Sequence, residues 1–377
     1  MNDVLLMTPG PTEVHEEVRK ALSQKFLTPD IDQSIFDFYR NTCCKIKELL
    51  KTKNDVLILC GEGILGLEAA CASLIEPGDK VLCLDNGIFG RGFANFAQIY
   101  GADVQILEFD YRKDIDAEVL EKFLKKNNNF KLATLVHCET PSGITNKVDI
   151  ICPILKKHGI LTVVDSVSAI GGEQLLADEW CMDVVLGASQ KCLSAPPGLT
   201  FMSISQEAWR IINNRKSPIK SFYCNISNWQ SWYEKKWFPY TQPANDIAGF
   251  ETAVQRIVSE KHNIERHSKL ADLVRKTISI SGLCLYPLQG FSNTVSTVYI
   301  PQGINFDELY GELLYNHKVM IGSNFGFLKD ITFRIGHMGE NCREEKLYVL
   351  FKSLDAALRK FGAKIKEPMH KIYTDLC

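Results

Sequence analysis

Two neighbouring stretches decide the fold: Asp183-Val184-Val185-Leu186-Gly187 and, after Ala188, Ser189-Gln190-Lys191-Cys192-Leu193-Ser194-Ala195-Pro196-Pro197-Gly198. An apolar run without polar alternation predicts a strand that is covered on both faces. The Pro-Gly-rich stretch predicts a turn. Lys191 lies between the two, which is a poor place for a solvated surface charge. It is well placed to hold an amine in a cleft at the end of a sheet.

A second apolar run, Ile160-Leu161-Thr162-Val163-Val164, ends in Asp165. Ligands of open α/β sheets bind beyond the carboxyl ends of the strands, so Asp165 and Lys191 can converge on one ligand. Pyridoxal phosphate needs such a pair, because a lysine forms the Schiff base and a carboxylate faces the pyridinium nitrogen. Taken alone, Asp165 also suits a helix cap.

From about residue 55, apolar runs alternate with helix-like segments, which predicts an α/β fold with a mostly parallel sheet. The closely spaced runs near Lys191 leave room for one antiparallel strand, since only a turn separates them. The predicted strands are 55–60, 80–85, 104–109, 132–137, 160–164, 183–186 and 199–204, and the predicted helices are 65–74, 91–100, 116–126 and 150–158.

The pattern changes after residue 220. An aromatic-rich segment ends at Thr241-Gln242-Pro243, and a long helical pattern runs over 245–279. Strand-like and helical segments then follow to the C-terminus, which predicts a smaller α+β unit. We therefore expect an N-terminal arm at 1–13, a large cofactor-binding α/β domain at 14–260 and a small C-terminal α+β domain at 261–377.

Composition excludes several classes of function. The chain has 377 residues, of which 45% are hydrophobic, and a net charge of −2, so nothing suggests a polyanion-binding surface such as one for nucleic acid. It contains no apolar run of about 18 residues, and its start is not typical of a signal peptide. The 13 cysteines include no Cys-x-x-Cys pair, so we interpret them as reduced, packed thiols and predict no metal site and a cytoplasmic location.

Further polar and small residues fall at the same predicted sheet edge. Gly61-Glu62-Gly63 opens the helix after the first strand, where backbone N–H groups can meet a phosphate. Phe89 is a candidate to lie flat on an aromatic cofactor, although a lone Phe is more often a core residue. Thr140 could donate its hydroxyl to a phosphate or to a phenolic oxygen. His137, in the same loop as Thr140, is as plausible a structural residue as a site residue.

Other readings remain open on these residues alone. Gly61, Gly63 and Gly66 formally complete a G-x-G-x-x-G motif, which would suit a nicotinamide dinucleotide or a nucleotide-binding regulatory protein, but such a site would leave Lys191 unused. The same turn could also be a tight packing turn without a ligand.

Motifs along nearly the whole chain resemble the class V, fold-type I pyridoxal-phosphate aminotransferases. The similarity is to the group of alanine–glyoxylate, serine–glyoxylate or serine–pyruvate, and 2-aminoethylphosphonate–pyruvate aminotransferases. The matching motifs are Thr8-Pro9-Gly10-Pro11, Leu67-Glu68-Ala69-Ala70, Glu76-Pro77-Gly78-Asp79, Asn86-Gly87-Ile88-Phe89-Gly90, Asp165-Ser166-Val167, Ser189-Gln190-Lys191 and Phe333-Arg334-Ile335-Gly336.

The resemblance implies a role for each matched position. Lys191 would be the Schiff-base lysine, Asp165 the partner of the pyridinium nitrogen, and Arg334 the bidentate grip on the substrate carboxylate. The implied cofactor, pyridoxal 5′-phosphate, would contact Glu62, Gly63, Ile64, Phe89, Thr140, Val167 and Gln190. Thr241 would reach the phosphate from a second subunit of a homodimer.

The resemblance also implies the reaction, a ping-pong transamination from a small amino acid of the alanine or serine type to glyoxylate or pyruvate. The alternative within the group is 2-aminoethylphosphonate–pyruvate transamination, for which Arg91 and Arg112 are conceivable phosphonate contacts. A cysteine desulfurase would need a reactive cysteine near the site, and Gly322-Ser323-Asn324-Phe325-Gly326 offers none.

Two positions depart from the family pattern. Relatives often carry Ser where Glu62 stands and His or Ser where Ile64 stands. A carboxylate would repel a phosphate, so we expect Glu62 to point away and leave only backbone N–H groups in the cradle. Phe238 stands where some relatives use Tyr to reach the phosphate, and Tyr240 is a conceivable substitute.

Overall fold

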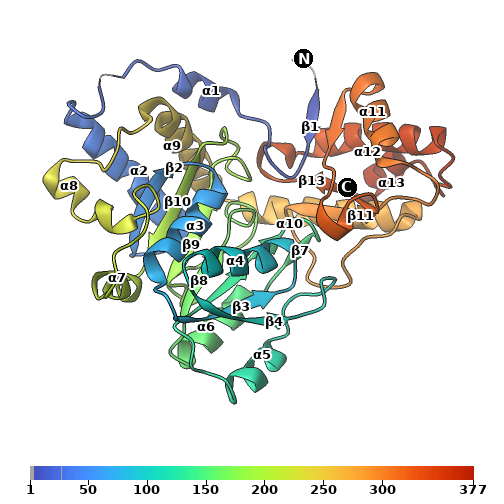
Figure 1. The fold of residues 1–377 in the computed structure, drawn as a ribbon. Helices are drawn as coiled ribbons and strands as arrows, with labels where there is room; N and C mark the ends of the chain where they lie inside the picture. The colour runs from blue at the N-terminus through green and yellow to red at the C-terminus, as the bar shows by residue number, and fades with distance from the viewer. Residues whose placement is uncertain (1–3, 27) are drawn as a thin grey trace.

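The computed structural model describes residues 4–26 and 28–377 and is built around a seven-stranded sheet (Figure 1). Its strand order is β2-β10-β9-β8-β5-β3-β4. β10 runs antiparallel to both of its neighbours, and all other pairs are parallel. The predicted mostly parallel α/β sheet is confirmed, with one antiparallel strand at the place the spacing allowed. The strands are β2 (Asp55–Cys60), β3 (Lys80–Asp85), β4 (Asp103–Glu108), β5 (Leu132–Val136), β8 (Leu161–Asp165), β9 (Val184–Ala188) and β10 (Leu199–Ile204).

Helices connect the parallel strands close to their predicted positions. They are α3 (Gly63–Leu74), α4 (Ile88–Ile99), α5 (Ala117–Leu124) and α6 (Val148–Lys157). Asp116 caps α5, because its carboxylate accepts hydrogen bonds from the backbone N–H groups of Glu118 and Val119. Two short strands, β6 (Cys138–Glu139) and β7 (Ile144–Thr145), form a small antiparallel pair beside the main sheet.

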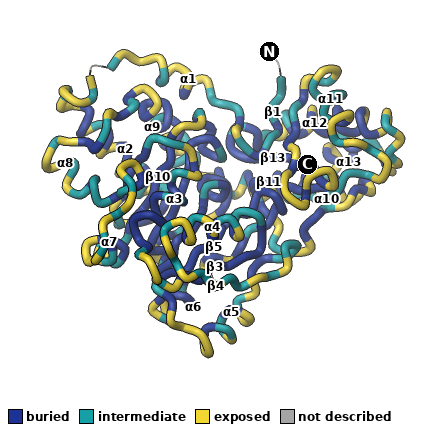
Figure 2. The backbone as a smooth tube through the Cα atoms, in the orientation of Figure 1, coloured by how far each residue is buried: buried dark blue, intermediate teal, exposed yellow. Residues whose placement is uncertain are grey.

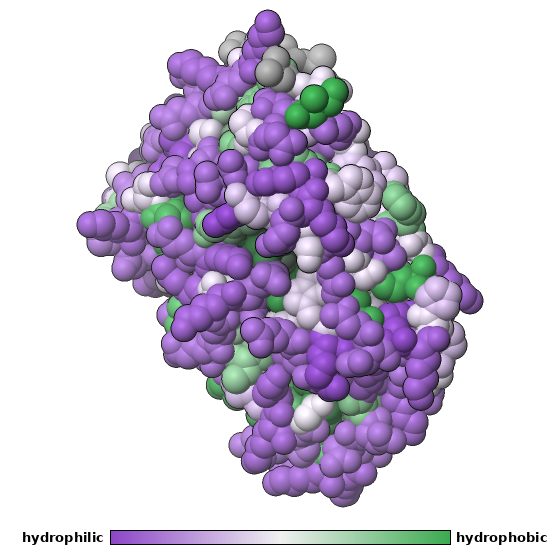
Figure 3. Space-filling model, turned by 90° about the vertical axis from the view of Figure 1, so that its left-hand side faces the viewer, coloured by the Kyte–Doolittle hydropathy of each residue, from purple (hydrophilic) through white to green (hydrophobic). Residues whose placement is uncertain are grey.

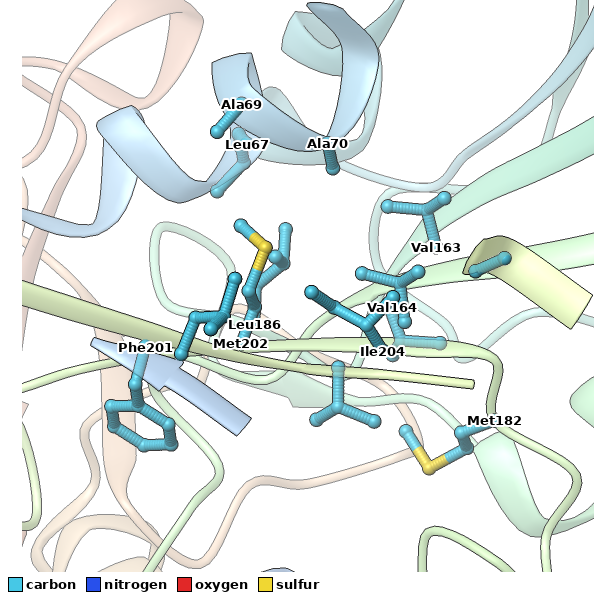
Figure 4. Packing of buried hydrophobic residues seen from close by; sticks show 14 of the residues in the cluster. Leu67, Ala69, Ala70, Val163, Val164, Met182, Leu186, Phe201, Met202 and Ile204 are labelled. Carbon is cyan, nitrogen blue, oxygen red and sulfur yellow. The ribbon is translucent and has the colours of Figure 1, made fainter. Parts of the chain in front are cut away.

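The central strands are covered on both faces, which explains their continuous apolar runs. Every residue of β8, β9 and β10 is buried, and the centre of the large unit is dark in Figure 2. In Figure 4, Leu67 and Ala70 of α3 lie over Leu186 and Met202, whereas Phe201 points to the opposite side of the sheet. This packing fixes α3 against β9 and β10, so the start of α3 lies at the edge of the sheet where β9 ends.

The long helix predicted over 245–279 is wrong in one respect. The structure divides it into α9 (Ala244–Ser259) and α10 (Asn263–Ser281). Glu260 has an extended conformation (φ −86°, ψ 92°), which ends the helical ladder, and its carboxylate pairs with Arg266 and Arg343. Both helices bury one apolar face, so the periodicity continues across the break and hides it.

The C-terminal part has its own hydrophobic core. There β11 (Val295–Tyr299) pairs antiparallel with β13 (Thr332–Gly336), and helices pack around them at one end of the molecule in Figure 1. The arm strand β1 (Leu5–Met7) pairs in parallel with β12 (Val319–Ile321), so the arm is ordered, as expected for its described residues. The domain boundaries themselves stay a prediction. The helices here are α11 (Phe306–Asn316), α12 (Glu344–Lys360) and α13 (Met369–Leu376), with short turns η2 (Gly326–Leu328) and η3 (Gly339–Asn341).

Several helices were not predicted from the sequence: α1 (Glu16–Leu22), α2 (Ser34–Leu50), α7 (Gln206–Asn213), α13 and the short η1 (Ile226–Trp229) and α8 (Trp232–Lys235). The last two lie in the segment that was expected to be irregular. The face in Figure 3 is mostly hydrophilic, with only scattered hydrophobic residues. Within residues 4–26 and 28–377, no helix has the length and apolar character needed to cross a membrane.

Candidate active site

Lys191 lies just beyond the end of β9 with its amine inside the protein. Its Nζ donates a hydrogen bond to the backbone carbonyl of Pro9, with an N···O distance of 2.6 Å. Gly10 packs so closely that a Cβ added there would lie 2.5 Å from Lys191 Cδ. Burial lowers the pKa of Lys191 to about 8, and the positive charge of Arg334 acts in the same direction. About one tenth of this amine is therefore unprotonated at pH 7, far more than for a surface lysine.

Asp165 is the last residue of β8, the strand beside β9. Its Oδ1 accepts a hydrogen bond of 2.9 Å from the backbone N–H of Val167, and only 8% of the residue is exposed. Burial raises the pKa of Asp165 to about 6, although the nearby charge of Lys191 lowers it. The carboxyl is thus mostly ionised at neutral pH. Since β8 and β9 are adjacent and parallel, their carboxyl ends bring Asp165 and Lys191 to one edge of the sheet.

The start of α3 forms the next wall of the site. Gly63 packs so closely that an added Cβ would lie 3.1 Å from Val167 Cγ2. Val167 is half-buried, and Gln190 precedes Lys191 directly with its Oε1 buried and without a hydrogen-bond partner among the described residues. The sequence-predicted contacts Gly63, Val167 and Gln190 therefore lie at the same edge of the sheet as Asp165 and Lys191.

Glu62 does not behave as the sequence predicted. Its carboxylate turns back onto the helix, where Oε1 accepts a hydrogen bond of 3.1 Å from the backbone N–H of Ile64. Its Oε2 accepts a hydrogen bond of 3.2 Å from Gln190 Nε2. The expectation that Glu62 points away is wrong, because the unpaired N–H groups and positive end of α3 attract a carboxylate. The Ile64 side chain is 40% exposed and contributes no polar group.

Phe89 opens α4 at the same edge of the sheet. Its ring meets the ring of Phe325 edge-on, with 5.7 Å between the centroids. Its backbone N–H donates a hydrogen bond of 3.2 Å to Glu139, which also accepts from the N–H of Gly90. Thr140 follows Glu139 and is buried.

Glu139 and Phe325 are site residues that the sequence reasoning missed. Glu139 is fully buried, and burial raises its pKa to about 8, although the N–H groups of Gly90 and Phe89 lower it. It holds the first turn of α4 and thereby the backbone of Phe89. An acid directly after a strand, in a polar loop already noted for its neighbours, was the available signal. Phe325 gave no signal, because its contact comes from the distant C-terminal part.

Arg334 lies in β13 of the C-terminal part, close enough for its charge to act on Lys191. Its Nε donates a hydrogen bond of 2.8 Å to the Ser323 carbonyl, and its guanidinium lies 5.0 Å from the centre of the Phe325 ring. Burial lowers the pKa of Arg334 to about 10, so it remains charged at neutral pH. Its guanidinium places a positive charge next to Lys191.

Thr241 is not part of this cleft wall. It is exposed, and its hydroxyl donates a hydrogen bond of 2.8 Å to Asp30. Phe238 is buried and stacks on Phe36, with 4.5 Å between the ring centroids. Tyr240 stacks on Tyr223 at 4.4 Å, and its buried hydroxyl has no partner among the described residues.

Three other candidate residues have structural partners. Arg91 pairs with Asp85 and Glu108 at 3.2 and 2.7 Å. The Nε of Arg112 donates to the Tyr286 carbonyl at 3.0 Å. His137 is buried, with a pKa that burial lowers to about 3, so it is a neutral structural histidine. Neither arginine favours a phosphonate substrate.

The donor set fits one end of a vitamin B6 molecule. A buried amine can join the aldehyde, a buried carboxylate can face the ring nitrogen, and Phe89 and Val167 offer apolar surface for the ring. The other end differs, because the carboxylate of Glu62 already binds the N–H group of Ile64 that a phosphate would use.

Comparison with known proteins identifies the family of this chain. The family model for class V aminotransferases matches residues 5–323. A pyridoxamine–pyruvate transaminase of Mesorhizobium japonicum is 30% identical over 96% of this chain and 93% of its own length. An alanine–glyoxylate aminotransferase of Drosophila melanogaster is 28% identical over 97% and 95%. The crystal structure of ureidoglycine–glyoxylate aminotransferase from Bacillus subtilis superposes with a TM-score of 0.95 at 30% identity, over 99% of this chain and 97% of the other. The chain belongs to the class V aminotransferase family and is a transaminase with the fold-type I architecture.

Proposed function

We propose that this transaminase moves an amino group from a small amino acid of the alanine or serine type to glyoxylate or pyruvate. The observation that carries the proposal is the convergence of Lys191 and Asp165 at adjacent strand ends, with the charged Arg334 beside them. Relatives with glyoxylate or pyruvate in their names support the choice of acceptor. Donor and acceptor would use the same cleft in turn, which is a ping-pong cycle.

A vitamin B6 group, when bound, supplies a ring that accepts the electrons released when a proton leaves the substrate carbon. Pyridoxal 5′-phosphate is the form that the family implies, and its ring is the part that these residues fit. Asp165 would keep the ring nitrogen protonated, because an ionised, buried carboxylate favours a positive neighbour. Lys191 would hold the aldehyde carbon and then carry the proton, since its lowered pKa lets the amine act as a base near neutral pH.

Arg334 would bind the carboxylate that amino acid and oxo acid share. Its Nε is fixed on the Ser323 carbonyl and its guanidinium stacks near Phe325, so the remaining N–H groups have a defined direction. A pre-oriented, desolvated guanidinium favours a small substrate with one carboxylate next to the reacting carbon.

The proposal includes the setting of the enzyme. We place it in the cytoplasm, which the free thiols of all 13 cysteines support. We also propose a homodimer in which Thr241 faces the second subunit, and the division into 1–13, 14–260 and 261–377. The exposure of Thr241 on the surface of a single chain is compatible with that position.

Lys191→Ala tests the proposal. With alanine or serine as donor and glyoxylate or pyruvate as acceptor, the variant should lose about a thousandfold or more in kcat, because base catalysis and covalent binding disappear together. Lys364→Ala, at an exposed lysine of the C-terminal part, is the matched control and should retain full activity. Turnover by Lys191→Ala at the rate of the control would remove Lys191 from the reaction and overturn the proposal.

A further inference from the structure

The first turn of α3 carries a carboxylate at the place where the family binds phosphate. Glu62 Oε1 accepts from the N–H of Ile64, and the carbonyl of Glu62 accepts from the N–H of Leu65 at 2.9 Å. The N–H of Gly61 donates to the Gly198 carbonyl at 2.8 Å. Three backbone donors of this turn, the N–H groups of Gly61, Ile64 and Leu65, are thus engaged within the chain and are not free for an anion.

Most of the side-chain donors expected for a phosphate are also missing or engaged, whereas the buried Tyr240 hydroxyl has no partner among the described residues. Ile64 has no polar atom, and Phe238 has no hydroxyl and is packed on Phe36. The Thr241 hydroxyl donates to Asp30. Glu62 itself forms no ion pair with a lysine or arginine among the described residues.

Glu62 lies close to the proposed ring-binding residues. Its negative charge acts on Asp165, and its carboxylate is hydrogen-bonded to Gln190, the neighbour of Lys191. A dianionic phosphate bound here would face this carboxylate at close range, and the like charges would repel each other. A neutral hydroxymethyl group at the same position would instead donate a hydrogen bond to the carboxylate, which suits its acceptor oxygens.

We propose that the cleft takes vitamin B6 without its phosphate, so that pyridoxamine is an amino donor and pyridoxal a released product. The proposal rests on the proposed function, because it uses the same Lys191 and Asp165. Glu62 selects the form by accepting a hydrogen bond from the 5-hydroxymethyl group and repelling a 5′-phosphate. Lacking a phosphate anchor, the ring compound leaves after each cycle as a substrate does.

The balanced reaction is pyridoxamine plus a 2-oxo acid giving pyridoxal plus the amino acid. The bond between the 4′ carbon and nitrogen of pyridoxamine breaks, and a carbon–nitrogen bond forms at the oxo carbon of the acid. The 4′ carbon is oxidised from amine to aldehyde level, and the oxo carbon is reduced to amine level. Lys191 moves one proton from the 4′ carbon to the acid carbon, and the water released in one half is consumed in the other.

The experiment uses the full-length wild-type enzyme with pyridoxamine and pyruvate. Formation of pyridoxal and alanine is followed by absorbance and chromatography, and binding of pyridoxal and of pyridoxal 5′-phosphate is titrated separately. We expect pyridoxamine to be turned over and pyridoxal to bind at least about tenfold more tightly than the phosphorylated form.

Glu62→Ser is the selective variant, because it removes the charge and supplies a hydroxyl donor. It should shift the preference toward pyridoxal 5′-phosphate by about tenfold or more. Glu62→Gln, which keeps the shape of the side chain, should shift it in the same direction. Glu68→Gln is the matched control, since Glu68 lies in the same helix and accepts from the Tyr100 hydroxyl at 2.9 Å. Its preference should equal that of the wild type.

The possible failures differ from one another. A wild-type enzyme that binds pyridoxal 5′-phosphate more tightly than pyridoxal, and transaminates amino acids without using pyridoxamine, overturns this inference and leaves the proposed function standing. An unchanged preference in both Glu62 variants also overturns it. Absence of binding by either aldehyde at Lys191 overturns the proposed function as well.

Discussion

The two ends of the active site differ in how far their charged residues are buried. At the ring end, Asp165 and Lys191 lie at the ends of adjacent buried strands, and burial shifts both pKa values toward neutrality. At the other end, Glu62 is an exposed carboxylate that caps α3. Under our proposals, the first end holds the groups for proton transfer, and the second end determines which form of the ring compound binds.

A change at the ring end should affect every form of vitamin B6 alike. In Asp165→Asn the ring nitrogen loses its anionic partner, so kcat should fall about a hundredfold with either pyridoxamine or an amino acid as donor. Steady-state rates with both donors check this. The exposed Asp149, at the start of α6, gives the control Asp149→Asn with unchanged rates. A loss confined to one donor would break the distinction between the two ends.

The pH dependence of Lys191 should sharpen the same distinction with a smaller effect. With a pKa of about 8, its unprotonated fraction rises from about one tenth at pH 7 to about nine tenths at pH 9. The rate at which pyridoxal reacts with the enzyme should rise about ninefold over that range. A stopped-flow absorbance series measures it, and Arg334→Ala should move the midpoint upward because a positive neighbour is lost. A rate that keeps rising until pH 10, as for an exposed lysine, would contradict a buried amine.

The sequence predicted the ring end better than the rest of the site. Buried parallel strands produce apolar runs, and polar residues at the end of a run or shortly after it stand out in the sequence, as Asp165 and Lys191 do. The break at Glu260 was hidden, because both flanking helices share one apolar period.

Contacts between distant parts of the chain left no local pattern. The packing of Phe325 between Phe89 and Arg334 depends on the C-terminal part docking at the cleft. The Glu62 side chain could be expected either to point into solvent or to turn back onto the N-terminus of α3. Electrostatic repulsion from an assumed phosphate led to the wrong prediction, whereas the backbone donors of α3 decided it.

Borohydride trapping in an equal mixture of pyridoxal and pyridoxal 5′-phosphate, followed by peptide mapping, tests the central claim most directly. Reduction fixes whichever aldehyde has joined an amine, and the two adducts differ in mass by the phosphate. The account predicts the adduct on the peptide containing Lys191, mainly in the form without phosphate. An adduct on another lysine, or a predominantly phosphorylated adduct on Lys191, would contradict it.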